Sequence, residues 1–395
     1  MEKMDAKRIY IGSWFQRTTL HLSEVYDFFM TGDSPLELDK KKLKKLRDNL
    51  NLETVEDIHG DFEYISAVTK NGISLKIYED GLITLSRDPE GDIKDDIELI
   101  TSYYEKELSA GLKYIFSLGA PIPKELANIK TVYPYFVVFE NETEQNILKF
   151  IADFGQKKHF EIKKETFEVY RGNLLYIVNL KGESLKNVEK FIGETIFIRE
   201  FKGQMHRYLN LHRIIWENIA EVKERGSIRG KDVSEFKNKI ESYEKSINMI
   251  DTRINQMGAY IKTRGAIVKS DPEMEKFADV LEFKYETLSN TLSYVKEIWK
   301  MTRTYVGSAL GVFTDLQSKA TNNSIKNLTV VTSMGVGGTL LGLFGQDKLP
   351  DFTTAGVYYF VILAAIGYAV NKIMNTIYLN KDYSIKNVKA DKNIK

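Results

Sequence analysis

Cationic and aromatic side chains gather in one helical stretch of this chain. They are Arg199, Lys202, His206, Arg207, Arg213 and Trp216. Cations bind phosphate oxygens and flat rings stack on bases, so this combination is typical of a nucleotide site. Positions 199, 202, 206, 213 and 216 fall on adjoining faces of one helix, which would let several side chains converge. The alternative is a solvated helix face with Trp216 in a packing seam.

A second candidate ligand site is Trp14 with Arg17, where the first expected strand, residues 8–15, ends. Strand ends in α/β units commonly bind ligands. The alternative is a half-buried tryptophan beside a helix cap. The chain has no cysteine, no glycine-rich phosphate loop and no metalloprotease spacing among its five histidines. We therefore expect a protein that is not an enzyme and has no covalent cofactor.

Alternating apolar patterns and turn residues predict an α/β domain over residues 1–193, with two similar halves, 1–120 and 130–193. The turns Asn71-Gly72 and Asp80-Gly81 predict hairpins. The shared element order suggests two packed α/β layers. The expected strands are 8–15, 62–69, 73–79, 82–87, 132–140, 166–170 and 174–180; the expected helices are 20–30, 39–50, 92–118, 143–154 and one from 185 onward.

Residues 194–324 have a helical pattern, and we expect a stalk of long helices there, with breaks at 226–230 and 264–272. The third helix begins near Asp271 and Pro272, a favourable cap and first-turn pair. No proline follows before Pro350, so one helix could continue as far as Phe344.

Two apolar stretches, 328–344 and 352–370, are joined by the short loop 345–351. They predict a transmembrane hairpin over residues 325–375, followed by a basic tail, 376–395. A buried hairpin of a soluble protein is the alternative. Lysines concentrate outside the loop, which predicts a plasma-membrane protein in contact with lipid, with both termini in the cytosol. The flanking lysines are Lys319, Lys326, Lys372, Lys381, Lys386, Lys389 and Lys392.

Helical spacing also predicts a pore face on the first of these helices. Polar residues stand at its cytosolic end, and apolar ones beyond them could form a hydrophobic constriction. The proposed pore-lining residues are Asn323, Asn327, Val331, Met334, Gly338 and Leu341.

A mixed α+β domain, a helical stalk and a C-terminal membrane hairpin together resemble the CorA family of divalent cation channels. Residues 322–329 resemble the family's Asn, Lys and Leu-Thr pattern, and Leu349-Pro350-Asp351 resembles its loop Met-Pro-Glu. The resemblance implies a homopentamer whose first membrane helices line a pore. Gly345-Gln346-Asp347 stands where the family has Gly-Met-Asn, which puts magnesium selectivity in doubt. The resemblance implies that Gly345, Gln346 and Asp347 form the pore mouth, with Asp347 as the metal ligand; a solvated loop charge is the alternative for Asp347. Divergent members without that signature accompany type III CRISPR systems.

The expected function is therefore an ion channel gated by a ligand on its cytosolic domain. By resemblance, it would be an antiviral effector opened by a nucleotide messenger, S-adenosylmethionine joined to AMP. A transporter of divalent cations such as magnesium, cobalt or zinc is the alternative, and a membrane-anchored scaffold is a third. With 56 basic and 55 acidic residues, no overall charge suggests a direct nucleic-acid partner. The sequence determines neither the ion nor the ligand.

Overall fold

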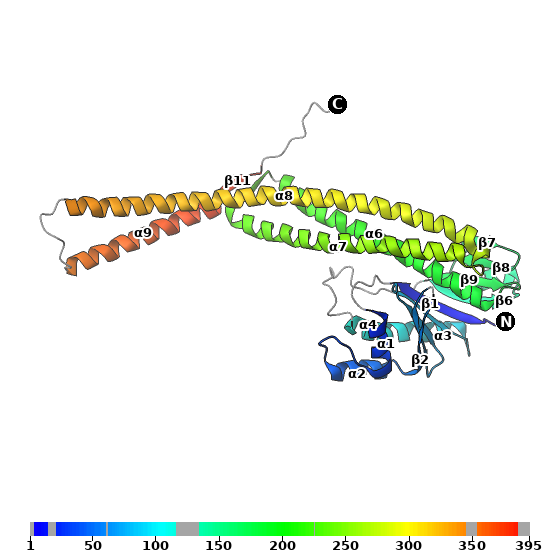
Figure 1. Ribbon diagram of the computed structural model, residues 1–395. Coiled ribbons are helices and arrows are strands. Elements are labelled where there is room, and N and C mark those ends of the chain that lie inside the picture. Colours follow the sequence, from blue (N-terminus) through cyan, green and yellow to red (C-terminus); the bar gives the residue numbers. More distant parts are fainter. Residues whose placement is uncertain are drawn as a thin grey trace, which may run out of the picture. The chain divides into compact units, whose positions relative to one another are not determined.

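The computed structural model describes residues 4–14, 21–60, 62–115, 134–224, 226–344 and 354–385 (Figure 1). For part of the last two helices, only the backbone is described. The fold is mixed α/β, with one large sheet and several long helices. It divides into two compact units, one with Met1–Tyr208 and Ile250–Lys296, the other with Leu209–Met249 and Glu297–Lys395.

The first unit contains a nine-stranded sheet with the order β2-β3-β4-β5-β1-β6-β9-β8-β7. β6 and β9 are parallel, whereas the other neighbours are antiparallel. The strands are β1 (Arg8–Trp14), β2 (Leu52–Ile58), β3 (Tyr64–Thr69), β4 (Ser74–Tyr78), β5 (Leu82–Arg87), β6 (Tyr135–Glu140), β7 (Phe160–Lys163), β8 (Phe167–Arg171) and β9 (Leu175–Leu180).

Two expectations about this sheet are corrected. The halves of the α/β region do not form two layers, because β1 pairs with β6 and joins all the strands into one sheet. The two edge strands, β2 and β7, were not predicted. Both are mostly exposed. The apolar residues of β2, at 52, 55 and 58, recur at every third position rather than every second, and β7 alternates over only four residues, so neither pattern identifies a strand.

Short helices and a hydrophobic core cover one face of the sheet. Ile9 and Ile11 of β1 belong to this core together with Phe28 and Leu112. The helices are α1 (Leu22–Thr31), α2 (Lys40–Asn49), α3 (Ile93–Tyr103), α4 (Ser109–Ile115) and α5 (Glu144–Asp153). A π-helical turn, Tyr104–Leu108, separates α3 from α4 where one regular helix was expected.

The opposite face of β1 packs against long helices within the same unit. The ring of Trp14 contacts the rings of Phe197 and Phe201, at centroid distances of 5.7 and 5.2 Å. Next to it, a Cβ added to Gly12 would lie 2.6 Å from the carbonyl oxygen of Ile83 and 2.8 Å from Ile196 Cδ1. Only glycine allows the helix to approach this strand so closely.

The long helices are α6 (Leu185–Glu224), α7 (Gly230–Ser270), α8 (Glu275–Phe344) and α9 (Thr354–Asn380). A break was expected over residues 264–272; it begins later than expected, because α7 continues to Ser270 and α8 begins at Glu275. α8 is one helix of 70 residues, as the absence of proline predicted. β10 (Ser227–Arg229) and β11 (Asp382–Ser384) form a small antiparallel ladder in the second unit. Within the described residues, no helix combines the length and apolar character that a membrane crossing requires.

Candidate functional site

A buried arginine, Arg264 of α7, ties together four elements of the first unit. Its guanidinium donates to both carboxylate oxygens of Asp80, at 2.5 and 2.9 Å, and to one oxygen of Glu194 at 2.6 Å. The other oxygen of Glu194 accepts a hydrogen bond from the hydroxyl of Tyr285. Asp80 lies between β4 and β5, Glu194 on α6 and Tyr285 on α8. A hairpin turn and three long helices therefore share one set of charge-assisted hydrogen bonds.

The charges of this cluster are not balanced, since one cation faces two carboxylates. Burial raises the pKa of Glu194 and the nearby charge of Asp80 raises it further, whereas Arg264 and the Tyr285 hydroxyl oppose the shift. Burial also raises the pKa of the Tyr285 phenol. For Arg264, burial alone lowers the pKa, but the two carboxylates more than offset this and hold it well above its usual value. Arg264 therefore stays charged.

A cavity of about 250 Å³ lies beside the cluster and is partly walled by aromatic rings. The Arg264 guanidinium lies 4.8 Å from the ring centroid of Phe62 and 5.5 Å from that of Tyr78. Tyr78 packs in turn on Tyr64, with centroids 5.0 Å apart. The guanidinium thus has aromatic faces as well as carboxylates around it, an arrangement that stabilises a desolvated cation.

The lysines of this cavity already have acidic partners. Lys76 pairs with Glu189 at 2.5 Å, and Lys190 pairs with Asp271 at 2.6 Å and Glu273 at 2.5 Å. An anionic ligand would have to displace a carboxylate before it could bind either ammonium. The cavity therefore offers no unpaired lysine to an anion, and a charged ligand would have to replace one of these lysine–carboxylate pairs.

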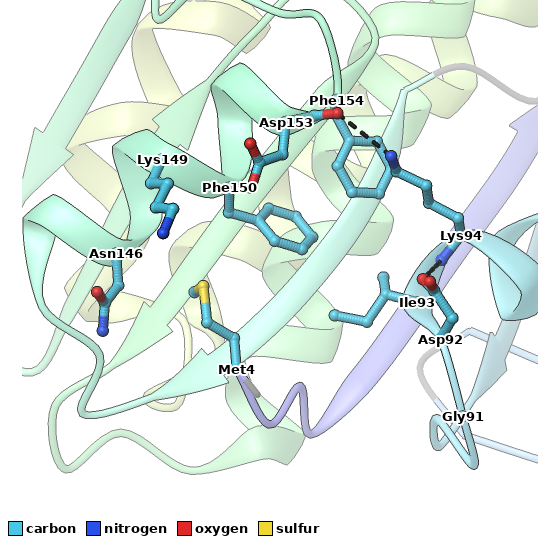
Figure 2. A pocket seen from close by; sticks show the side chains of 10 residues that line it. All are labelled: Met4, Gly91, Asp92, Ile93, Lys94, Asn146, Lys149, Phe150, Asp153 and Phe154. Carbon is cyan, nitrogen blue, oxygen red and sulfur yellow. Dashed lines mark hydrogen bonds between the residues drawn. The ribbon is translucent and has the colours of Figure 1, made fainter. Parts of the chain in front are cut away.

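A larger cavity, of about 580 Å³, lies in the same unit between the start of α3 and one face of α5 (Figure 2). The rings of Phe150 and Phe154 line it, with centroids 4.7 Å apart. Lys94 Nζ lies 5.2 Å from the ring centroid of Phe154 and donates to the carbonyl oxygen of Asp153 at 3.3 Å. Lys149 also lines this cavity, and no described acidic residue forms an ion pair with it. The volume is that of a small-molecule pocket, and its rings suit a flat ligand. Its charged lining is mixed, since Lys94 and Lys149 could bind an anionic group, whereas Asp92 and Asp153 also line the cavity.

The predicted cations of α6 are only partly brought together. In the first unit, Lys202 and His206 are exposed, whereas Arg199 and Arg207 are half-buried. The two arginines act on the same carboxyl group: burial raises the pKa of Glu200 to about 7, and Arg207 and Arg199 partly oppose that shift. One guanidinium nitrogen of Arg199, Nη1, is buried with no hydrogen-bond partner. The sequence pointed to these arginines but not to the half-buried acid on which both act.

Arg213 and Trp216 belong to the second unit, separately from the other predicted cations. Arg213 is exposed and donates to Asn210 at 3.1 Å. The Trp216 ring is stacked on Tyr305, with a centroid distance of 4.1 Å and an interplanar angle of 21°. One face of this ring is therefore occupied by protein, which favours the packing interpretation of Trp216.

Trp14 is also a packing residue, because it is buried and its indole Nε1 donates to the carbonyl oxygen of Asp80 at 2.9 Å. Arg17 lies outside the described residues, as do the proposed pore mouth Gly345, Gln346 and Asp347.

The proposed pore-lining residues lie on α8, and the described side chains do not include theirs. They are Asn323, Asn327, Val331, Met334, Gly338 and Leu341. In the part of the chain that is described, no three His, Asp or Glu side chains are grouped as a metal site would require.

The Arg264 cluster was missed in the sequence, where Asp80 had been interpreted as a hairpin residue only. Arg264 and Asp80 are 184 positions apart in the sequence, so no local pattern connects them. The arginine itself was a signal. Arg264 lies three positions after Ile261 and four before Val268, so it shares a helix face with these two buried apolar residues. A charge on an apolar helix face requires a buried partner.

No family model matches the chain, and no curated protein is similar to it. Among solved structures, the CorA magnesium transporter from Methanocaldococcus jannaschii is similar, with a TM-score of 0.29 and 12% identity over 63% of this chain and 91% of that one. A likeness of this size does not define a family.

Proposed function

We propose that this protein is a CorA-like homopentameric ion channel of the plasma membrane, gated by a ligand that binds its α/β unit. Residues 325–375 form the membrane hairpin in this proposal, with both termini in the cytosol. The support is in the sequence: two long apolar stretches, a short loop and lysines on the outer flanks of the hairpin.

The observation that carries the proposal is the continuity of α8. Its first part packs inside the α/β unit, where the ring of Phe277 lies 4.6 Å from that of Phe167 and 4.8 Å from that of Phe191. The same helix ends at Phe344, at the end of the first apolar stretch. A ligand that favours one packing of the α/β unit over another would thereby bias the position of a pore-lining segment, provided that its affinities for the two states differ.

The ligand that we propose is a nucleotide messenger, S-adenosylmethionine joined to AMP, as in the type III CRISPR effectors that the sequence resembles. Two sets of residues are candidates for binding it. One is the arginine pair Arg199 and Arg207 near the half-buried Glu200. The other is the cavity of Figure 2, with two phenylalanine rings and Lys149. Val331 and Met334 would form the constriction.

Flux from liposomes that contain the purified full-length protein tests this function. Ion release on addition of the messenger, and none without it, is the expected result. Arg207→Ala and Lys149→Ala show which candidate set binds the ligand, and Arg213→Ala is the matched control. Magnesium uptake that needs no nucleotide would support the divalent cation transporter instead. An absence of flux under both conditions would leave only a scaffold.

A further inference from the structure

Helix α2 carries an unusual concentration of positive charge, since lysine occupies five of its first six positions. All five lysines are exposed: Lys40, Lys41, Lys42, Lys44 and Lys45. None of them forms an ion pair with a described acidic residue. Among the acids next to this helix in the sequence, Asp39 accepts from the backbone of Lys41 and Lys42, Asp48 lies 3.8 Å from Arg47, and Glu37 is exposed.

This charge pattern works against the helix that carries it. Lys40, Lys41 and Lys42 occupy the first turn, where the helix dipole is positive and anions are favoured. Lys40 and Lys44, and likewise Lys41 and Lys45, are four positions apart, so like charges repel on one face. Lysines that destabilise their own helix and pair with no acid of the same chain are expected where a surface binds another molecule.

The helix is nevertheless fixed to the first unit. Leu43 is 1% exposed within the core, and Leu46 packs against that core. At its C-terminal end, Arg47 Nε donates to the carbonyl oxygen of Phe29 at 3.0 Å. At its start, the Tyr114 hydroxyl accepts from the backbone of Asp39 at 3.2 Å, and Lys42 lies over the Tyr114 ring. In Figure 1, α2 lies beside α1 and α4 at the border of this unit.

The remaining lysines, Lys40, Lys41, Lys44 and Lys45, form a cationic face on a fixed support. Residues one turn apart lie about 6 Å from each other along the helix axis. This spacing suits a partner with closely and regularly spaced anions, as phosphates are in a nucleic-acid backbone. Lysines act as point charges, and the arginine of this helix is already bound to the main chain, so no side chain on this face offers the fork that reads a base.

We propose that the lysine face of α2 binds the phosphate backbone of a nucleic acid, independently of its sequence. A membrane surface fits less well, because helices that lie on a bilayer insert an apolar face, and α2 has buried its leucines in the core. The expectation of no nucleic-acid partner rested on the balanced charge of the whole chain, whereas this face is local. The inference does not depend on the proposed channel function.

Fluorescence anisotropy with a labelled DNA duplex of mixed sequence tests the proposal, with the full-length protein in detergent micelles. Four lysine–phosphate contacts predict that log K falls with log salt concentration with a slope of about −3.6. The double variant Lys44→Gln and Lys45→Gln should change this slope to about −1.8 and weaken binding roughly 10- to 100-fold at about 0.1 M salt. A second duplex of different sequence should bind the wild-type protein equally well.

The matched control is Lys245→Gln with Lys262→Gln, which removes two exposed lysines from α7 and changes the net charge by the same amount. This control should bind the duplex as the wild type does. The α2 variant should keep or raise its thermal midpoint, because the substitutions relieve repulsion, and a fall in binding is then not caused by unfolding. Three outcomes would overturn the proposal: no duplex binding, equal loss in the control, or binding of the lysine face to anionic-lipid micelles alone.

Discussion

Replacing Arg264 by methionine should destabilise the first unit more than most single substitutions do. The side chain of Arg264 is 3% exposed and that of Asp80 0% exposed. Methionine fills much of the same volume but leaves the Asp80 and Glu194 carboxylates buried with no cation. Removing one partner of a buried ion pair costs about 3–5 kcal/mol. For a folded unit of this size, roughly 2–4 °C of thermal midpoint corresponds to each kcal/mol, so Arg264→Met should lower the midpoint by roughly 6–20 °C.

Thermal unfolding of the full-length protein, followed by tryptophan fluorescence, measures this shift, because Trp14 lies in the same unit and donates to the main chain of Asp80. Arg213→Met is the matched control, since Arg213 is exposed and its contacts, to Asn210 at 3.1 Å and to Glu217 at 3.9 Å, lie at the surface. We expect it to change the midpoint by no more than about 2 °C.

A neutral replacement of the whole cluster separates lost charge balance from lost packing. The combination Arg264→Met, Asp80→Asn and Glu194→Gln should recover at least half of the loss, since no uncompensated charge stays buried. A shift for Arg264→Met no larger than that of Arg213→Met would refute the reasoning. So would a triple variant that is less stable than the single one.

Three further predictions concern other positions. Burial raises the pKa of Glu200 from 4.5 to about 7, so the folded state holds an extra proton between these pH values, and up to about 3 kcal/mol of stability is lost as the pH rises through them. Glu200→Gln should make the thermal midpoint depend less on pH in this interval, and an unchanged pH dependence would contradict this. Burial lowers the pKa of His212, whose Nδ1 lies 2.5 Å from Thr302 Oγ1, so the unfolded state takes up a proton first and stability should fall as the pH drops below 6.5. His212→Gln should remove that loss in the same assay. Gly12→Ala would place a Cβ 2.6 Å from the carbonyl oxygen of Ile83 and should cost about 1–3 kcal/mol in chemical denaturation, whereas a neutral effect would mean that the strand can shift.

Much of the first unit could be predicted because its signals are local. Asn71-Gly72 and Asp80-Gly81 each place a glycine with positive φ, 70° and 93°, in a hairpin turn, and both hairpins form. The helix over residues 143–154 follows from its amphipathic pattern and the Thr143 cap, whose hydroxyl accepts from the backbone of Asn146 at 3.3 Å.

What could not be predicted depends on partners far away in the chain. Arg264-Gly265 was interpreted as a helix break, yet the helix continues because Arg264 finds its partners in the sheet hairpin and on α6. Gly265 does not interrupt the helix either, and a Cβ added there would make only ordinary contact with the Tyr285 ring, at 3.7 Å. The joining of two halves into one sheet depends on the pairing of β1 with β6, about which neither strand carries local information.

The central claim, that residues 325–375 cross a membrane with both termini in the cytosol, is tested most directly by cysteine accessibility. The chain has no native cysteine, so single cysteines can be labelled without background. A membrane-impermeant maleimide applied to intact cells should label Gln346→Cys, in the loop between the apolar stretches, and should label Asn387→Cys, in the tail, only after permeabilisation. Equal labelling of both positions in intact cells, or protection of both until lysis, would contradict the account.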